Sequence, residues 1–277
     1  MTDAVLEARG LAKRYRRGVW ALQAIDLAIP AGGITALVGP NAAGKSTLIK
    51  TWVGFERPTR GSAAVMGLDP LRQRSESLAH VGYVPQSPSL YDALTVDHHL
   101  AMAVQLRPGF DRAYAAERLE QLGIPLSAPA RQLSGGQQAQ VALALALGTR
   151  AEILLLDEPL ASLDPLARRE FLHVLTDAVR RDGATALLSS HIVTDVEQAC
   201  DNLIVLGVGR VLLHDSVADA LATHAISLTE RPDAVAAFAA ADGSLLWLVR
   251  GEADRPATLE EVVLGYLASA RTRSLAA

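Results

Sequence analysis

Cysteine is almost absent from this sequence, and aromatic residues are scarce. Cys200 is the single cysteine among 277 residues, so an intramolecular disulfide is excluded and a reducing compartment is expected. Aromatic side chains make up 4% of the chain while 50% of the residues are hydrophobic, so the core must be largely aliphatic. An aliphatic core suits parallel strands that are buried on both faces.

The sequence also lacks any long apolar run and any large excess of one charge. No hydrophobic stretch approaches the roughly 18 residues that a membrane-spanning helix needs. The first residues do not show the basic and then apolar layout of a signal peptide. With a net charge of −4 and dispersed lysines and arginines, no nucleic-acid partner is expected. We expect a cytosolic protein, or one that reaches the inner face of a membrane through a partner.

What the chain does contain is a phosphate-loop pattern, and its spacing is typical of nucleotide-binding loops. Its residues are Gly39, Pro40, Asn41, Ala42, Ala43, Gly44, Lys45, Ser46 and Thr47. The apolar run 34–38 predicts a buried strand before the loop, and residues 47–53 predict a helix after it. Glycines let backbone N–H groups converge on an anion at the positive end of that helix. Lys45 can reach the β- and γ-phosphates of a nucleotide, and the Ser46 hydroxyl can hold Mg²⁺.

Two carboxylates and a histidine follow other predicted strands. The apolar run 153–156 ends in Asp157 and Glu158, whose side chains point to opposite sides, so one is expected to serve a metal ion and the other a water molecule. The alternative is that the pair only forms a polar strand end at a turn. His191 follows the predicted strand 185–189, where sheets of this kind carry ligand-binding residues.

The predicted elements change character along the chain. Strands are expected over 4–9, 21–29, 34–38, 61–67, 80–84, 153–156, 185–189 and in a hairpin at 202–213, with helices over 165–181 and 215–223. Three helices near 95–106, 111–122 and 134–149 indicate a helical subdomain at about 87–150. We expect a first domain over 1–223 and a small appendage over 224–277. The appendage is predicted as strand 225–229, helix 232–241, strand 244–250 and a last helix that opens with a capping box at Thr258 to Glu261.

Taken together, these segments resemble the nucleotide-binding subunit of ATP-binding cassette (ABC) transporters, over about residues 4–223. Six motifs occur in the family's order: Tyr15, the loop 39–47, Gln86, the signature Leu133 to Gln137, the strand end Ile153 to Glu158, and His191. Asp164, in Ala161-Ser-Leu-Asp164, matches the family's dimer-contact loop. The tail looks like that of bacterial single-domain members that pair with a separate membrane protein, often an exporter.

The resemblance implies an α/β fold with a phosphate-loop NTPase core, a parallel sheet, an antiparallel N-terminal β layer and an inserted helical signature subdomain. It implies that two copies, identical or paralogous, bind two ATP molecules head to tail, and that closure moves an integral membrane permease. Lys45 and Ser46 would hold the triphosphate and Mg²⁺ together with the loop. The second copy would close on the γ-phosphate with its signature and dimer-contact residues, which are Ser134, Gly135, Gly136, Gln137 and Asp164.

The same resemblance implies a role for each remaining motif. Tyr15 would stack on adenine, and Asp157 would hold Mg²⁺ directly or through water. Glu158 would polarise the attacking water, an effect typically worth about 10²–10⁴ in rate. His191 would orient the γ-phosphate. Gln86 would contact both the metal region and the groove where the membrane subunit docks.

The sequence departs from the family pattern at a few positions. Ala42 stands where glycine is usual, which keeps the backbone N–H but can cost on the order of 1 kcal/mol in backbone strain. Gln138 to Val141 and Leu145 lack the arginines that commonly follow the signature. Two other functions remain open: a cassette ATPase that acts on soluble partners, and a phosphate-loop kinase, which would leave the signature and His191 without a role.

Overall fold

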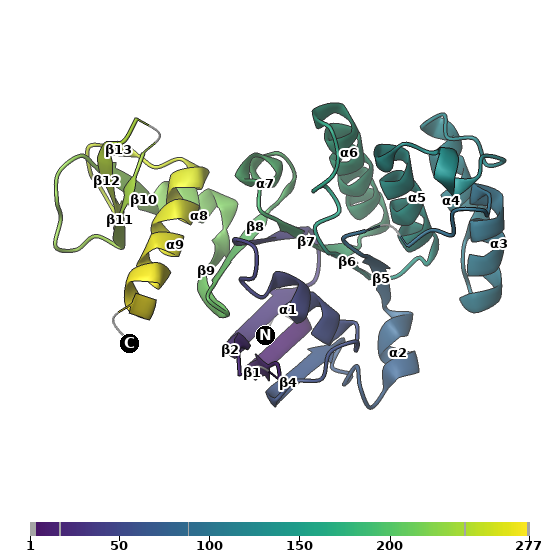
Figure 1. Ribbon diagram of the computed structural model, residues 1–277, viewed down its shortest axis with the longest axis horizontal. Helices are drawn as coiled ribbons and strands as arrows, with labels where there is room; N and C mark the ends of the chain where they lie inside the picture. Colours follow the sequence, from purple (N-terminus) through teal and green to yellow (C-terminus); the bar gives the residue numbers. More distant parts are fainter. Residues whose placement is uncertain (1–3, 17, 88, 241, 276–277) are drawn as a thin grey trace.

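In the computed structural model, which describes residues 4–16, 18–87, 89–240 and 242–275, the strands form three β sheets (Figure 1). The largest has the strand order β5-β6-β7-β3-β8-β9 and is parallel except for the β8–β9 hairpin. Its strands are β3 (Ile34–Val38), β5 (Val81–Val84), β6 (Ile153–Leu156), β7 (Thr185–Ser190), β8 (Asn202–Gly207) and β9 (Arg210–Ser216). Every residue of β3, β6 and β7 is buried, which confirms the predicted aliphatic parallel core.

An antiparallel sheet with the order β2-β1-β4 forms the predicted N-terminal layer. Its strands are β1 (Ala4–Arg14), β2 (Trp20–Pro30) and β4 (Arg60–Val65). Helix α1 (Lys45–Trp52) lies between this layer and the large sheet, and side chains of all three share one hydrophobic core. Trp52 is fully buried there, and its indole Nε1 donates a hydrogen bond to the Glu7 carbonyl at 2.8 Å. Helix α1 is therefore packed on both sides, and its last residue is hydrogen-bonded to β1.

Helices α5 (Gly135–Gly148) and α6 (Pro165–Asp182) cover the other face of the large sheet. Helices α3 (Val96–Leu106) and α4 (Arg112–Gln121) pack on α5 through a separate apolar cluster, at the right of Figure 1. These helices match the predicted ones to within two residues at each end. Helices α2 (Arg74–Ala79) and α7 (Val193–Ala199) were not predicted. Within the part of the chain that the structure describes, no helix is both long and apolar enough to cross a lipid bilayer.

The C-terminal residues form an antiparallel sheet with the order β11-β12-β10-β13, preceded by α8 (Val217–Thr223) and followed by α9 (Leu259–Leu275). The strands are β10 (His224–Ser227), β11 (Ala236–Ala239), β12 (Leu245–Arg250) and β13 (Arg255–Pro256). Side chains of α9 share a core with this sheet, with α7 and with the large sheet. The C-terminal sheet is thus attached to the rest of the molecule by buried apolar contacts.

The predicted helix over 232–241 is wrong. Residues 236–239 form β11, which pairs antiparallel with β12, from Ala236 opposite Leu248 to Ala239 opposite Leu245. Phe238 is buried between the more exposed Ala237 and Ala239, the period of two that a half-buried strand requires. Alanine favours a helix, but the cross-strand pairing and the burial of Phe238 outweigh that local preference here.

The capping box that was predicted at the last helix is present. The Thr258 amide donates to Glu261 Oε2 at 2.9 Å, and the Glu261 amide donates to Thr258 Oγ1 at 3.2 Å. The Arg255 guanidinium and the Thr258 groups lower the pKa of Glu261 to about 2, so its carboxylate stays charged at neutral pH. At the start of α9 the capping box therefore satisfies two N–H groups, those of Thr258 and Glu261.

We expect Thr258→Ala to lower the free energy of unfolding by about 1 kcal/mol, because the Glu261 amide loses its acceptor. Chemical denaturation followed by circular dichroism measures the change. Thr258→Ser keeps the hydroxyl and is the control, which should retain most of the stability. An alanine variant as stable as the wild type would show that the cap contributes nothing to α9.

Candidate nucleotide-binding site

The carboxyl ends of four parallel strands meet at one edge of the large sheet. Val38 at the end of β3 lies opposite Ser190 of β7, and Val84 of β5 lies opposite Leu156 of β6. The next groups along the chain are the loop 39–44, Gln86, Asp157, Glu158 and His191. This edge is where open α/β sheets bind ligands, and the predicted residues gather there because their strands run in the same direction.

The backbone of the phosphate loop needs its glycines. A Cβ atom on Gly39 would lie 2.2 Å from the Leu206 carbonyl oxygen. Gly44 has φ 110°, a conformation that other residues rarely adopt, and it caps the start of α1. Ala42 has φ 65°, so the predicted strain at this position is present in the structure. An alanine in the left-handed region costs about 1–2 kcal/mol, and the surrounding loop must offset this energy.

Lys45 is 3% exposed, and its ammonium group has three oxygen partners. Nζ donates to the Gly39 carbonyl at 2.6 Å and to the Pro40 carbonyl at 3.1 Å. It also lies 2.9 Å from Glu158 Oε1. The positive charge is thus held over the loop, within reach of any anion that the loop amides bind.

Asp157 faces the beginning of α1. The Ser46 hydroxyl donates to Asp157 Oδ1 at 2.7 Å, and the Asp157 side chain is almost fully buried. Ser189 of β7 lies behind both acids: its Oγ donates to Asp157 Oδ1 at 3.3 Å and accepts from the Glu158 amide at 2.7 Å. Ser189 was not singled out from the sequence. The one signal for it was a hydroxyl side chain at the carboxyl end of a predicted buried strand, two residues before His191.

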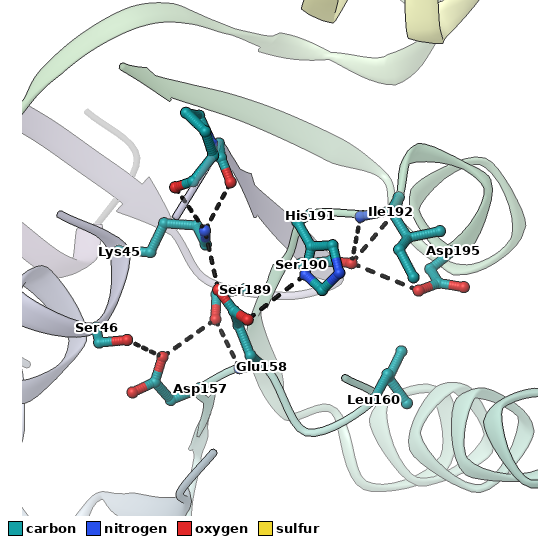
Figure 2. A network of polar contacts seen from close by, with 12 residues as sticks. Lys45, Ser46, Asp157, Glu158, Leu160, Ser189, Ser190, His191, Ile192 and Asp195 are labelled. Carbon is teal, nitrogen blue, oxygen red and sulfur yellow. Dashed lines mark hydrogen bonds and ion pairs between the residues drawn. The ribbon is translucent and has the colours of Figure 1, made fainter. Parts of the chain in front are cut away.

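Glu158 turns away from Asp157. Its backbone φ of 47° bends the chain after β6, and its carboxylate lies between Lys45 and His191 (Figure 2). His191 Nδ1 is 3.5 Å from Glu158 Oε2. The two acids therefore face different partners, as their adjacency predicted.

A cavity of about 440 Å³ opens above the loop. It is lined by Tyr15, Val19, Trp20, Ala21, residues 41–47, Gln86 and Glu158. The Tyr15 hydroxyl donates to Glu56 Oε1 at 3.0 Å, and it lies 3.4 Å from Thr47 Oγ1. The Lys13 ammonium lies over the Tyr15 ring at 5.0 Å from the centroid. Lys13 and Glu56, which the sequence did not identify, thus fix the ring at the rim of the cavity.

The signature residues lie at the start of α5 and do not line this cavity. The Gln137 amide donates to Ser134 Oγ at 3.2 Å, and the Ser134 amide donates to Gln137 Oε1 at 2.9 Å, a second capping box. Gly135 has open space around it, whereas a Cβ on Gly136 would lie 2.9 Å from the Ala167 methyl group. Asp164 caps α6 by accepting from the Leu166 and Ala167 amides. The structure therefore brings the loop, Gln86 and Glu158 together and keeps the signature apart from them.

These features define a phosphate-loop nucleotide-binding protein: the loop lies at the carboxyl edge of a parallel sheet, and beside it Ser46 contacts Asp157. Residues 22–161 match the sequence profile of the ABC transporter family. The chain belongs to this family, whose ATP-binding subunits are ATPases.

Individual relatives agree with this assignment. The probable multidrug ABC transporter ATP-binding protein YbhF of Escherichia coli is 36% identical over 218 residues, which cover 76% of this chain and 37% of YbhF. The methionine import ATP-binding protein MetN of Symbiobacterium thermophilum is 34% identical over 284 residues, which cover 93% of this chain and 83% of MetN. Among solved structures, CbiO1 of Clostridium perfringens, part of the CbiONQ transporter complex, has a TM-score of 0.70 at 30% identity and covers 79% of this chain and 91% of its own.

We expect Gly39→Ala to destabilise the phosphate loop, because its Cβ meets the backbone of β8 and overpacking of this kind costs about 1–3 kcal/mol. Thermal unfolding should show a lower midpoint, and calorimetry should show weakened ATP binding. Gly135→Ala adds the same methyl group in open space and should unfold like the wild type. Normal stability and ATP affinity in Gly39→Ala would contradict the close approach seen here.

Proposed function

We propose that this chain is the ATP-hydrolysing subunit of a membrane transporter and that two copies bind two ATP molecules between them. One observation supports this most directly: Lys45, Ser46 and the residues after β6 and β7 form one network of contacts, whereas the signature lies outside their cavity. A second subunit, identical or paralogous, that faces the first head to tail would supply Ser134 and Gly136 to the γ-phosphate.

In this proposal Lys45 and the amides of the loop 39–44 bind the triphosphate. The Ser46 and Asp157 oxygens, 2.7 Å apart, form a donor set of a hydroxyl and one carboxylate that suits Mg²⁺. Gln86 lines the same cavity and would add an amide oxygen. Bound Mg²⁺ would neutralise charge on the β- and γ-phosphates.

Glu158 is the proposed general base. Its carboxylate is shared between Lys45 and His191 in this structure. When Lys45 contacts phosphate, the Glu158 carboxylate would be left to accept a proton from the attacking water. His191 would donate a hydrogen bond to the γ-phosphate and keep that water in line. Tyr15, held by Glu56 at the rim of the cavity, would stack on adenine.

Closure of the dimer on ATP, and its opening after hydrolysis, would move an integral membrane permease, to which the chain would bind at the cytoplasmic face of the cell membrane. In this proposal residues 1–223 form the ATP-binding domain and residues 224–277 an appendage that contacts a partner. Export was predicted because the predicted elements of the tail resemble those of exporter subunits. One of those elements, the helix predicted over 232–241, is wrong, since residues 236–239 form a strand. Import is a second candidate, since the alignment with the methionine import protein covers 93% of this chain.

We expect Lys45→Ala to abolish ATP binding, because it removes the charge that pairs with the phosphates. Isothermal titration calorimetry with ATP and Mg²⁺ measures this. Lys50→Ala, on the same helix but outside the cavity lining, is the matched control and should bind like the wild type. Unchanged affinity in Lys45→Ala would refute the phosphate-loop assignment.

We expect Glu158→Gln to lose turnover, by a factor of about 10²–10⁴ for a general base, and to accumulate as an ATP-bound dimer. Its phosphate-binding groups remain while the proton acceptor is gone. Steady-state hydrolysis and size-exclusion chromatography with ATP measure the two effects. Glu170→Gln removes an exposed carboxylate on α6 and is the control. A Glu158→Gln protein that turns over normally, or stays monomeric with ATP, would argue against this role.

The transporter assignment is tested by what Glu158→Gln binds in its native cell. Affinity purification from solubilised membranes with ATP should recover a stoichiometric polytopic membrane protein. Recovery of soluble assembly proteins alone would instead favour the cassette ATPases that act outside transport. The permease recovered in this way could then be reconstituted in vesicles to determine the direction of transport.

A further inference from the structure

An ion pair between a buried aspartate and a partly buried arginine lies behind the proposed site and has no part in the chemistry described above. Asp195 of α7 has a side chain that is 4% exposed, and Arg168 of α6 has one that is 22% exposed. Arg168 Nε lies 3.9 Å from Asp195 Oδ1. The other arm of the guanidinium, Nη2, lies 3.4 Å from the Leu160 carbonyl and 3.3 Å from the Leu163 carbonyl. One side chain thus connects the loop 160–164 to α7.

Asp195 is connected in turn to the backbone around His191. The Ser190 hydroxyl lies 3.4 Å from Asp195 Oδ2 and 3.3 Å from the Ile192 carbonyl, so these two oxygens share its proton. The same hydroxyl accepts from the Ile192 amide at 3.0 Å. Figure 2 shows Ser190, Ile192 and Asp195 grouped on the side of His191 away from Lys45. Ser190 therefore contacts Asp195 directly, and Ile192 is connected to it through the Ser190 hydroxyl.

Burying a charged side chain costs free energy, so the contacts that Arg168 and Asp195 make indicate what the pair does. Burial raises the pKa of Asp195, and Arg168, Ser190 and His191 act in the opposite direction. Buried ion pairs add little net stability compared with apolar side chains of similar size, but loss of one partner leaves an uncompensated charge. Arg168 Nε is buried without a hydrogen-bond partner at its present distance from Asp195. A small shift of the Arg168 guanidinium toward Asp195 would therefore allow this nitrogen to form a hydrogen bond.

We propose that Arg168 and Asp195 are positioning residues that couple the loop 160–164 to His191. The inference rests on the proposed function, in which that loop contacts the second subunit and His191 contacts the γ-phosphate. Contact with the second subunit would move the loop carbonyls, Arg168 would follow them, and Asp195 with Ser190 would fix the backbone of His191. Hydrolysis would then depend on the dimer being closed.

The test is a double-mutant cycle with Arg168→Gln, Asp195→Asn and their combination. Each single variant should lower kcat by about tenfold, since a misplacement of about 1 Å can cost up to about 10²-fold. KM and the calorimetric affinity for ATP should change by less than about twofold, because neither residue lines the cavity. The double variant should lose no more than the larger single loss, as expected for two residues of one unit. Arg168→Lys should not restore kcat, because a single ammonium lacks the two arms that reach both loops.

Arg169→Gln is the matched control, because it removes the same charge from the next residue of α6, which is exposed. It should keep the kcat of the wild type. Losses of kcat that multiply in the double variant would overturn the proposal, as would singles that hydrolyse ATP normally. Single variants that lose ATP affinity by as large a factor as kcat would also overturn the proposal, since their defect would lie in binding.

A second measurement does not depend on hydrolysis. In hydrogen–deuterium exchange, Asp195→Asn should increase exchange of the Leu163 amide on the distant loop, and Arg168→Gln should increase exchange of the Ile192 amide beside His191. Arg169→Gln should change neither. If the wild type fails to hydrolyse ATP, the proposed function is refuted. The exchange rates of the Leu163 and Ile192 amides still show whether the loop and His191 are coupled. Exchange that rises only next to each substituted residue would refute the coupling even in an active enzyme.

Discussion

The site depends on the pairing of buried charges at one edge of the large sheet. Lys45 and Glu158 are 3% and 7% exposed, and an unpaired ion at such a depth would cost several kcal/mol. Two loop carbonyls and Glu158 are the partners of Lys45, and Ser46 and Ser189 both donate to Asp157 Oδ1. These partners come from the loop after β3, from α1, from the turn after β6 and from β7. None of the charges can be buried until those elements are assembled, so the fold and the site form together.

The backbone at the same edge of the sheet is strained, and the packing of the surrounding layers offsets the energy of that strain. Ala42 and Glu158 both adopt positive φ, at 65° and 47°, and such residues cost on the order of 1–3 kcal/mol each. The core that joins α1 to both sheets, including the buried Trp52, offsets this energy. At Glu158 the strain has a visible result, because the bend directs its carboxylate toward Lys45 and His191 and away from Asp157.

Sequence patterns correctly predicted the features that depend only on neighbouring residues. The phosphate loop, the strand ends and the capping box at Thr258 are signals within a few neighbouring residues, and the structure has the predicted elements there. Residues 232–241 show the limit, because an alanine-rich segment forms a strand only through its pairing with β12. Arg168 and Asp195 lie on different helices, and a charged residue on a helix is most often solvated. Only the folded chain shows that Arg168 faces two loop carbonyls and a buried acid.

The signature segment is already held in place by its capping box in the single subunit. This bears on which groups would have to change their contacts when a dimer closes. The capping box already fixes Ser134, whose oxygen accepts from the Gln137 amide while its proton remains available to donate to a phosphate. Asp164 is likewise held as the cap of α6. A second subunit would therefore meet preformed donors, so little ordering entropy would be lost at the signature. In the proposed dimer, the cost of closure would fall on Lys45 and Glu158, which form an ion pair here and would have to change partners. Their exchange of that ion pair for phosphate and water would make closure depend on nucleotide.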